Sequence, residues 1–262
     1  MELGLKDKCA LVMASSAGLG KAIATEFARE GANVMLFSPF EDELKQARQD
    51  IFSETGKNPS IFVGSITNAD DIKNLVKTTV DAYGPVFALV NNTGGPAAGN
   101  FDAFDDSAWQ KAYELTLLSY IRTIREVLPH MRANNGGRIL NSTSSSIKSV
   151  LDNLILSNTF RMGVVGLAKT LSQELGKDNI LVNVIAPGRI GTARIDYLDS
   201  VRAEKAGKTV EEIQQLAFAG IPLGRYGTPQ EYGKLAAFLC SSANTFITGQ
   251  SILVDGGMVK AI

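Results

Sequence analysis

Two polar residues, Ser157 and Arg161, stand four residues apart in the stretch LILSNTFRMGVVGLAKTL. The second half of this stretch has the apolar spacing of an amphipathic helix. An arginine keeps its positive charge, so Arg161 can hydrogen-bond a ribose or stabilise an oxyanion but cannot release a proton. A serine hydroxyl is a far weaker acid than a phenol, so Ser157 offers no proton that can be tuned towards neutral pH. Any proton used in chemistry here must therefore come from another group.

The segments around this stretch alternate between short apolar runs and longer runs of helical period. Strands are predicted at 9–14, 33–38, 60–64, 86–92, 137–143, 179–186 and 251–257, with helices between them and a long one at 105–134. Repeated β-α-β units with apolar strands form a parallel sheet with helices on both faces. The expected fold is a single doubly wound α/β domain over residues 1–262, with a crevice at the carboxyl ends of its strands.

A polar, helix-prone segment at 189–220 resembles a lid inserted over that crevice. Arg194, Arg202 and Lys205 stand among acidic residues in this segment. Such a pattern favours a solvated helix face, and it also fits a lid that admits an anionic substrate.

Composition narrows the classes of protein. The chain has 262 residues, 45% of them hydrophobic, which is enough to bury a sizeable core. A net charge of −1 without a long basic block argues against nucleic acid as a partner. No apolar run reaches the roughly 20 residues that span a bilayer, and the first residues lack the pattern of a signal peptide. We therefore expect a soluble cytoplasmic protein with no membrane partner.

Cysteine and histidine usage points to no metal centre. Cys9 and Cys240 both lie in apolar segments, which suits buried free thiols. His130 is the only histidine, and no His/Cys/Asp spacing supplies it with partners. No metal ligand is predicted.

The turn after the first predicted strand reads VMASSAGLGKAIA, with Gly18 and Gly20 where the following helix starts. Glycines at that point let the backbone approach a pyrophosphate, whose charge is stabilised by a helix N-terminus. The same glycines also suit a turn that only packs a helix against a strand.

The end of the second predicted strand bears on the choice of cofactor. Ser38-Pro39-Phe40 offers no acid to bind a ribose 2′-hydroxyl, which favours NADP(H) over NAD(H). Ser38, the free helix N-terminus and Lys21 are candidates to reach a 2′-phosphate. Ser38 and Glu41 also form an S-x-x-E capping box, which explains both residues without a ligand.

Eight collinear stretches resemble the short-chain dehydrogenase/reductase family, and in particular its 3-oxoacyl-[acyl-carrier-protein] reductase-like members, over nearly the whole chain. They are SSAGLGKAIA, VNNTGG, LPHM, GRILNSTSS, GVVGLAKTLSQEL, VNVIAPGRIGT, IPLGRYGTPQEYG and ITGQSILVDGG. The resemblance implies an oxidoreductase that acts on a small carbonyl or alcohol substrate with NAD(H) or NADP(H). It implies a Rossmann-type sheet of seven parallel strands in the order 3-2-1-4-5-6-7, and a homodimer or homotetramer.

The resemblance also implies where the cofactor binds. Gly18 and Gly20 would cradle the pyrophosphate, Asn91 to Gly94 would line the adenosine ribose and help to shape the fold, and Pro187 to Thr192 would meet the nicotinamide carboxamide. The full predicted set is Ser16, Gly18, Leu19, Gly20, Ser38, Asn91, Thr93, Gly94, Arg161, Pro187, Gly188, Ile190 and Thr192.

At the reaction end the chain departs from the family. The family uses a tyrosine that exchanges the proton, a lysine four residues later, a serine thirteen residues before the tyrosine, and an asparagine on the long helix. An alignment anchored on Gly166-Leu167 puts Ser157 and Arg161 at the tyrosine and lysine positions, with Ser144 at the serine position. Thr116 takes the asparagine position. The predicted catalytic residues are therefore Ser144, Ser157 and Arg161, in a subgroup without the Tyr-x-x-x-Lys pair.

Two departures affect the nucleotide end. Ala14 replaces the first glycine of the family's turn, and the turn persists if the φ of Ala14 is negative. Ser65 replaces an aspartate that contacts the adenine in the family, so we expect adenine to be recognised differently.

Two functions remain open at this point. In the first, a divergent oxidoreductase, Arg161 and Ser144 polarise the substrate oxygen. The proton then comes from water, or from Lys148 if burial lowers its pKa. Lys148 also fits a solvated loop lysine. In the second, the chain binds a nucleotide without turnover and acts as a sensor or partner subunit. The intact Ser144, Pro187–Thr192 turn and lid segment favour the first.

Overall fold

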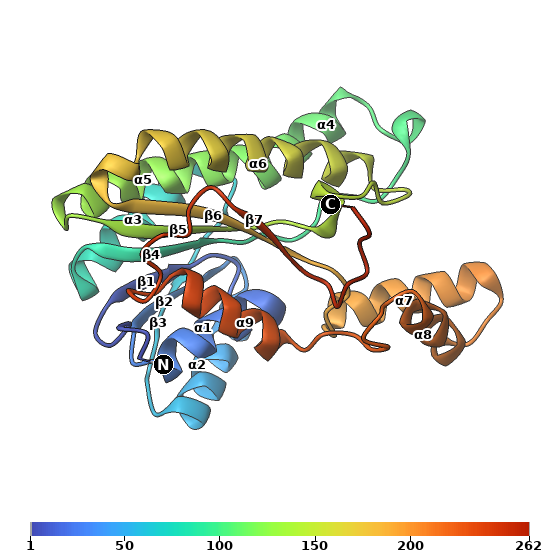
Figure 1. Ribbon diagram of the computed structural model, residues 1–262, viewed down its shortest axis with the longest axis horizontal. Coiled ribbons are helices and arrows are strands. Elements are labelled where there is room, and N and C mark those ends of the chain that lie inside the picture. The colour runs from blue at the N-terminus through green and yellow to red at the C-terminus, as the bar shows by residue number, and fades with distance from the viewer. Residues whose placement is uncertain (1, 262) are drawn as a thin grey trace.

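The computed structural model describes residues 2–261. Seven parallel strands form one sheet in the order β3-β2-β1-β4-β5-β6-β7, as predicted (Figure 1). The strands are β1 (Cys9–Val12), β2 (Asn33–Ser38), β3 (Ser60–Val63), β4 (Val86–Asn91), β5 (Gly137–Ser142), β6 (Ile180–Pro187) and β7 (Ser251–Val254). The strand order reverses between β1 and β4, and the crevice of a doubly wound sheet lies at such a reversal.

Two helical layers cover the sheet (Figure 1). The helices are α1 (Gly18–Arg29), α2 (Glu41–Thr55), α3 (Ala69–Tyr83), α4 (Asp106–Tyr113), α5 (Ser119–Ala133), α6 (Ile155–Glu174), α7 (Ala193–Ala206), α8 (Val210–Ala219) and α9 (Pro229–Leu239). Helices α1, α2 and α9 bury one apolar cluster against the sheet, and α3, α5 and α6 bury a second on the other face. Cys9 and Cys240 are buried free thiols, as predicted.

The segment 189–220 forms a pair of helices, α7 and α8, that projects away from the two layers (Figure 1). Helix α8 begins with a complete capping box between Thr209 and Glu212, so its start is fixed by local sequence. Among residues 2–261, no helix combines the length and apolar character needed to cross a membrane.

The long helix predicted at 105–134 is interrupted. Helices α4 and α5 are separated by a π turn over Glu114–Leu118, in which hydrogen bonds join residues five apart. The π turn adds one residue to the helix without breaking it. The apolar periodicity of the sequence therefore predicted one continuous helix. Thr116 lies within this turn.

The capping box predicted at Ser38 and Glu41 is wrong. Helix α2 begins only at Glu41, with Phe40 as its N-cap and no side-chain cap. Ser38 ends β2, where it pairs with Val63 of β3, and it lies two residues before the N-cap, too early to cap the first turn of α2. Its Oγ accepts a hydrogen bond from the Phe40 amide at 3.3 Å instead.

Candidate active site and nucleotide crevice

Ser157 and Arg161 lie on the first turns of α6, and both side chains are buried, each only 6% exposed. The Arg161 Nε donates to the Ser157 Oγ at 3.3 Å. Its Nη1 donates to the main-chain oxygen of Ser142, the last residue of β5, at 3.3 Å. Arg161 therefore links the start of α6 to the carboxyl end of a central strand.

Arg161 has no acidic partner among residues 2–261, where no Asp or Glu side chain lies within 4.0 Å of its nitrogens. A buried cation without a counter-charge is costly unless hydrogen bonds compensate for lost water. The guanidinium has five N–H donors, and the bonds to Ser157 and Ser142 leave several unused. These remaining donors are available to a ligand oxygen.

The main-chain oxygen of Ser142 has a second donor. The Tyr120 Oη lies 2.8 Å from it, and Tyr120 is fully buried. Burial raises the pKa of Tyr120 to about 12, although the nearby Arg161 guanidinium acts in the opposite direction. The Tyr120 phenol therefore stays protonated near neutral pH and does not replace the family's tyrosine as a titrating acid.

Ser144 lies two residues beyond the end of β5 and is partly exposed. Its Oγ accepts a hydrogen bond from the Ser146 amide at 3.2 Å, at the start of a short 3-10 helix, Ser145–Ile147. Because the hydroxyl accepts in this contact, its own proton is free to be donated to a substrate oxygen.

Thr116, predicted at the family's asparagine position, lies in the π turn that packs against α6. Its Oγ1 is buried and has no hydrogen-bond partner among the described residues. A Cβ at Gly163 of α6 would lie 2.8 Å from Leu117, which shows how tightly the two segments pack. A buried hydroxyl without a partner is uncommon, so Thr116 is available to a water or a ligand.

Lys148 is exposed, directly after the 3-10 helix. Lys148 is a candidate proton donor only if its ammonium group is buried, because burial favours the neutral form. The structure therefore contradicts that role, because the loop that carries Lys148 lies on the surface and leaves the side chain in water.

Ala14 has a φ of +46°. The negative φ expected from sequence for the turn to persist is therefore not observed. A residue with a Cβ pays roughly 1–2 kcal/mol in this left-handed conformation, whereas glycine pays little. The turn keeps its shape despite this cost. One hydrogen bond that stabilises it runs from the Asn92 Nδ2 to the Ala14 oxygen at 3.3 Å and connects the turn to the end of β4.

The two glycines of the turn have different functions. Gly18 has a φ of +54° and is exposed where α1 begins, and the Ala17 N-cap provides no side-chain hydrogen bond. The first amides of α1 thus remain able to bind an anion. Gly20 is buried, and a Cβ there would lie 2.1 Å from the Ala14 oxygen. Gly20 therefore allows the turn to pack closely against α1, and its predicted contact with a pyrophosphate stays a prediction.

Asn91 does not line the crevice with its side chain. It is fully buried, donating to Asn141 at 2.9 Å and accepting from Thr123 at 2.6 Å. Its neighbours Thr93 and Gly94 are partly and fully exposed, and their predicted contact with a ribose stays a prediction. A Cβ at Gly94 would have no heavy atom within 4 Å, so open space adjoins it.

The Pro187–Thr192 turn faces the glycine turn. A Cβ at Gly18 would lie 3.9 Å from the Thr192 Cγ2. Gly227 pairs with the Arg189 oxygen and the Gly191 amide, while the Ile190 peptide groups take no partner among residues 2–261. Free N–H and C=O groups are complementary to a carboxamide. These features fit a nicotinamide dinucleotide lying along this crevice.

The tip of β2 is more acidic than its sequence suggested. The Ser16 Oγ lies 3.0 Å from the Ser38 Oγ and 3.0 Å from the Glu43 Oε2. Lys21 pairs with Asp50 at 2.5 Å, so its ammonium group is engaged away from Ser38. Local sequence patterns did not predict this contact of Glu43, because Ser16 and Glu43 are 27 residues apart in the chain.

Comparison with known proteins agrees with this geometry. The protein-family model described as Enoyl-(Acyl carrier protein) reductase matches residues 13–259, a span that includes every segment of the crevice. The chain belongs to the short-chain dehydrogenase/reductase (SDR) family. SDR proteins of this type are NAD(P)-dependent oxidoreductases, as the relatives below illustrate.

Several SDR relatives are similar over their full length. The chain is 32% identical to 3-oxoacyl-[acyl-carrier-protein] reductase of Thermotoga maritima, covering 97% of this chain and 99% of that one. It is 33% identical to 7alpha-hydroxysteroid dehydrogenase of Escherichia coli, covering 99% and 97%. L-sorbose reductase from Gluconobacter frateurii, solved with NADPH and L-sorbose, superposes with a TM-score of 0.95 at 30% identity over all of both chains. A 7 alpha-hydroxysteroid dehydrogenase solved with NADH has a TM-score of 0.89 at 33% identity, covering 99% and 97%.

Proposed function

We propose that this SDR chain is an NADP(H)-dependent reductase of a small carbonyl substrate in which Arg161 takes over the task of holding the reacting oxygen. The observation that supports this proposal is the buried guanidinium of Arg161. It is held by hydrogen bonds to Ser157 and to the Ser142 oxygen, and it has no acidic partner among residues 2–261. Burying an unpaired guanidinium costs desolvation free energy, and binding a nucleotide without turnover would not require a cation at this position.

The cofactor, when bound, supplies the hydride that converts the carbonyl into an alkoxide. The residues of the chain bind and orient the substrate. Arg161 and Ser144 donate hydrogen bonds to the substrate oxygen, and these bonds strengthen as negative charge grows there. Ser157 positions Arg161 and does not itself release a proton. Because arginine keeps its proton, the alkoxide takes its proton from water, which becomes hydroxide.

The preference for NADP(H) rests on the absence of an acid at the tip of β2 and on the NADPH found in the L-sorbose reductase structure. Glu43 limits that preference, because its carboxylate is 3.0 Å from Ser16. The residues proposed to hold the cofactor are Ser16, Gly18, Leu19, Ser38, Thr93, Gly94, Arg161, Pro187, Gly188, Ile190 and Thr192.

Assembly as a homodimer or homotetramer and location in the cytoplasm are parts of the same proposal. The outer side of α5 and α6 supports assembly, since it has an apolar hollow of about 280 Å³. Its lining includes Ile121, Leu128, Pro129, Leu167 and Leu171.

The direct test follows NADPH oxidation with a panel of ketones and aldehydes, together with NADPH binding by fluorescence. We expect turnover by the wild type and a loss of about 10²–10³ in kcat for Arg161→Ala, the usual cost of removing an oxyanion donor. Lys73→Ala, at an exposed cation of α3 outside the crevice and the α5–α6 hollow, is the control and should leave kcat unchanged. NADPH binding without turnover of any carbonyl would instead support the second function, a nucleotide-binding sensor or partner subunit.

A further inference from the structure

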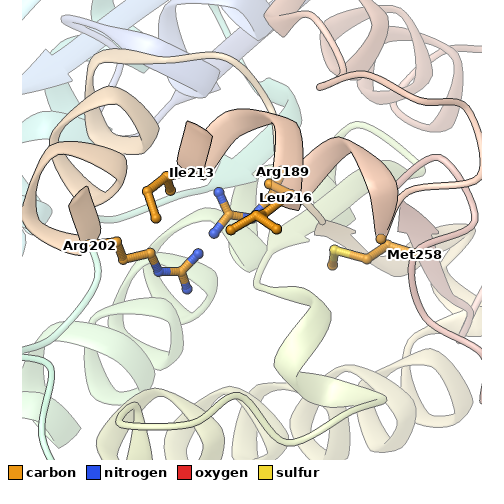
Figure 2. Close-up of a pocket in the computed structure, with 7 residues that line it drawn as sticks. Arg189, Arg202, Ile213, Leu216 and Met258 are labelled. Carbon is orange, nitrogen blue, oxygen red and sulfur yellow. The ribbon is translucent and has the colours of Figure 1, made fainter. Parts of the chain in front are cut away.

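The helices α7 and α8 border an open cavity of about 330 Å³, together with Arg189 and Met258 (Figure 2). We call it the α7–α8 cavity; it is lined by Arg189, Arg202, Ile213, Leu216, Ala217, Gly220 and Met258. Figure 2 shows Arg202 and Ile213 on one side and Met258 on the other, with Leu216 of α8 and Arg189 between them. Its volume is at the lower end of the range of small-molecule sites.

One of the two arginines is neutralised. The Arg189 Nη1 donates to the fully buried Asp199 of α7 at 2.8 Å and to the Tyr226 Oη at 2.9 Å. Tyr226 completes the triangle by donating to Asp199 at 2.7 Å. Burial and the Asp199 carboxylate raise the pKa of Tyr226 to about 12, so its hydroxyl remains a donor. This triangle fixes one wall of the cavity without adding net charge.

The second arginine, Arg202, is not neutralised. It lies one turn beyond Asp199 on α7, and no carboxylate of residues 2–261 comes within 4.0 Å of its nitrogens. The rest of the lining is mainly apolar, with Ile213 buried and Leu216 58% exposed although it is a leucine. The α7–α8 cavity therefore combines one free cation with an apolar wall.

The α7–α8 cavity adjoins the crevice. Arg189 belongs to the Pro187–Thr192 turn, which faces Gly18 across the crevice. Met258 also borders that turn, with its Cε 3.4 Å from where a Cβ of Gly188 would lie. A substrate whose carbonyl lies beside this turn can extend its other end towards Arg202.

We infer that the α7–α8 cavity binds a carboxylate on a short aliphatic stem, the carboxylate on Arg202 and the stem on Leu216, Ile213 and Met258. Arginine binds carboxylates through parallel N–H donors, which a neutral group cannot match. We further infer that the substrate is a keto acid whose carboxylate end occupies this cavity, and this inference rests on the proposed reductase function. Binding of the carboxylate itself does not.

The binding test uses equilibrium dialysis of radiolabelled hexanoate, with unlabelled 1-hexanol and acetate as competitors. We expect hexanoate to bind the wild type and to lose at least fivefold in affinity in Arg202→Gln and in Leu216→Ser. Hexanol and acetate should compete poorly, because each lacks one half of the recognised group. Lys205→Gln removes a charge from the same exposed helix outside the cavity lining, and it should bind hexanoate as the wild type does.

Equal hexanoate affinity in the wild type and Arg202→Gln, or an equal loss in Lys205→Gln, would overturn the inference. A second measurement compares kcat/KM for 4-oxopentanoate and its methyl ester. Arg202→Gln should lower the acid-to-ester ratio by at least fivefold, and Lys205→Gln should keep the wild-type ratio. If no carbonyl is reduced at all, the proposed function fails while the dialysis result still decides the carboxylate site.

Discussion

Across one turn of α6, the Arg161 Nε donates a hydrogen bond to the Ser157 Oγ at 3.3 Å. These residues hold the positions at which the SDR family resemblance implies a proton-donating tyrosine and its lysine. In this chain Ser157 and Arg161 hydrogen-bond to each other, and this bond positions the Arg161 cation. The family pair, by contrast, transfers a proton.

Restoring the family pair tests this division of tasks. In Ser157→Tyr/Arg161→Lys, a phenol tuned by a nearby ammonium could protonate the alkoxide directly, and general acid catalysis contributes typically 10²–10⁴ in rate. We expect kcat for the best carbonyl substrate to rise by at least tenfold. Arg161→Lys alone is the control and should be slower than the wild type. Circular dichroism must show that both variants fold, because residue 157 is buried. A folded double variant that binds NADPH but is no faster than the wild type would show that protonation does not limit turnover.

Ala14→Gly should stabilise the protein. Ala14 has a φ of +46°, and removing its Cβ relieves left-handed strain of roughly 1–2 kcal/mol, partly offset by the entropy that glycine adds to the unfolded chain. We expect a gain of up to about 1 kcal/mol in the free energy of unfolding, measured by urea denaturation. Ala17→Gly lies in the same turn with an extended φ of −152° and should not stabilise. Equal effects of the two substitutions would refute the strain at Ala14.

Glu43→Gln should strengthen the preference for NADPH. The Glu43 carboxylate is 3.0 Å from Ser16, beside the tip of β2 where the 2′-phosphate is proposed to bind. Two exposed charges a few ångström apart repel by about 1 kcal/mol in water, which is roughly fivefold in Kd. The Kd for NADPH should fall by about this factor at low salt, and the Kd for NADH should not change. Glu41→Gln, a neighbour paired with Lys45, is the control. A parallel change for both cofactors would place Glu43 away from the 2′ position.

Alkaline pH should destabilise the fold through Tyr120. Its folded pKa of about 12 exceeds the ordinary value of 10.0, so the protonated phenol stabilises the fold fully below about pH 10. That contribution is lost as pH rises from 10 towards 12, because the unfolded chain releases its proton first. We expect Tyr120→Phe to lose less unfolding free energy over this interval than the wild type, by up to about 2 kcal/mol. Tyr197→Phe, at an exposed tyrosine, should behave as the wild type in the same urea titrations.

Apolar runs and helical periods are local, so the sequence by itself predicted the strands of the sheet. The family resemblance implied their order, which the structure confirms. The assignment of Ser144, Ser157 and Arg161 to the reaction end came from an alignment with the family and stays a prediction. The buried free thiols of Cys9 and Cys240 followed from their apolar surroundings in the same way.

Tertiary structure decided what those residues can do, because their partners are far away in sequence or depend on backbone angles. Arg161 and Tyr120 meet on one oxygen of Ser142, which is 19 and 22 residues distant from them. The burial of Asn91 depends on β5 and α5 packing around it. The positive φ of Ala14 and the π turn at Thr116 are backbone states that one residue type does not encode. The position of Arg202, an exposed cation that lines the α7–α8 cavity beside apolar side chains, likewise depends on how α7, α8 and the C-terminal segment come together.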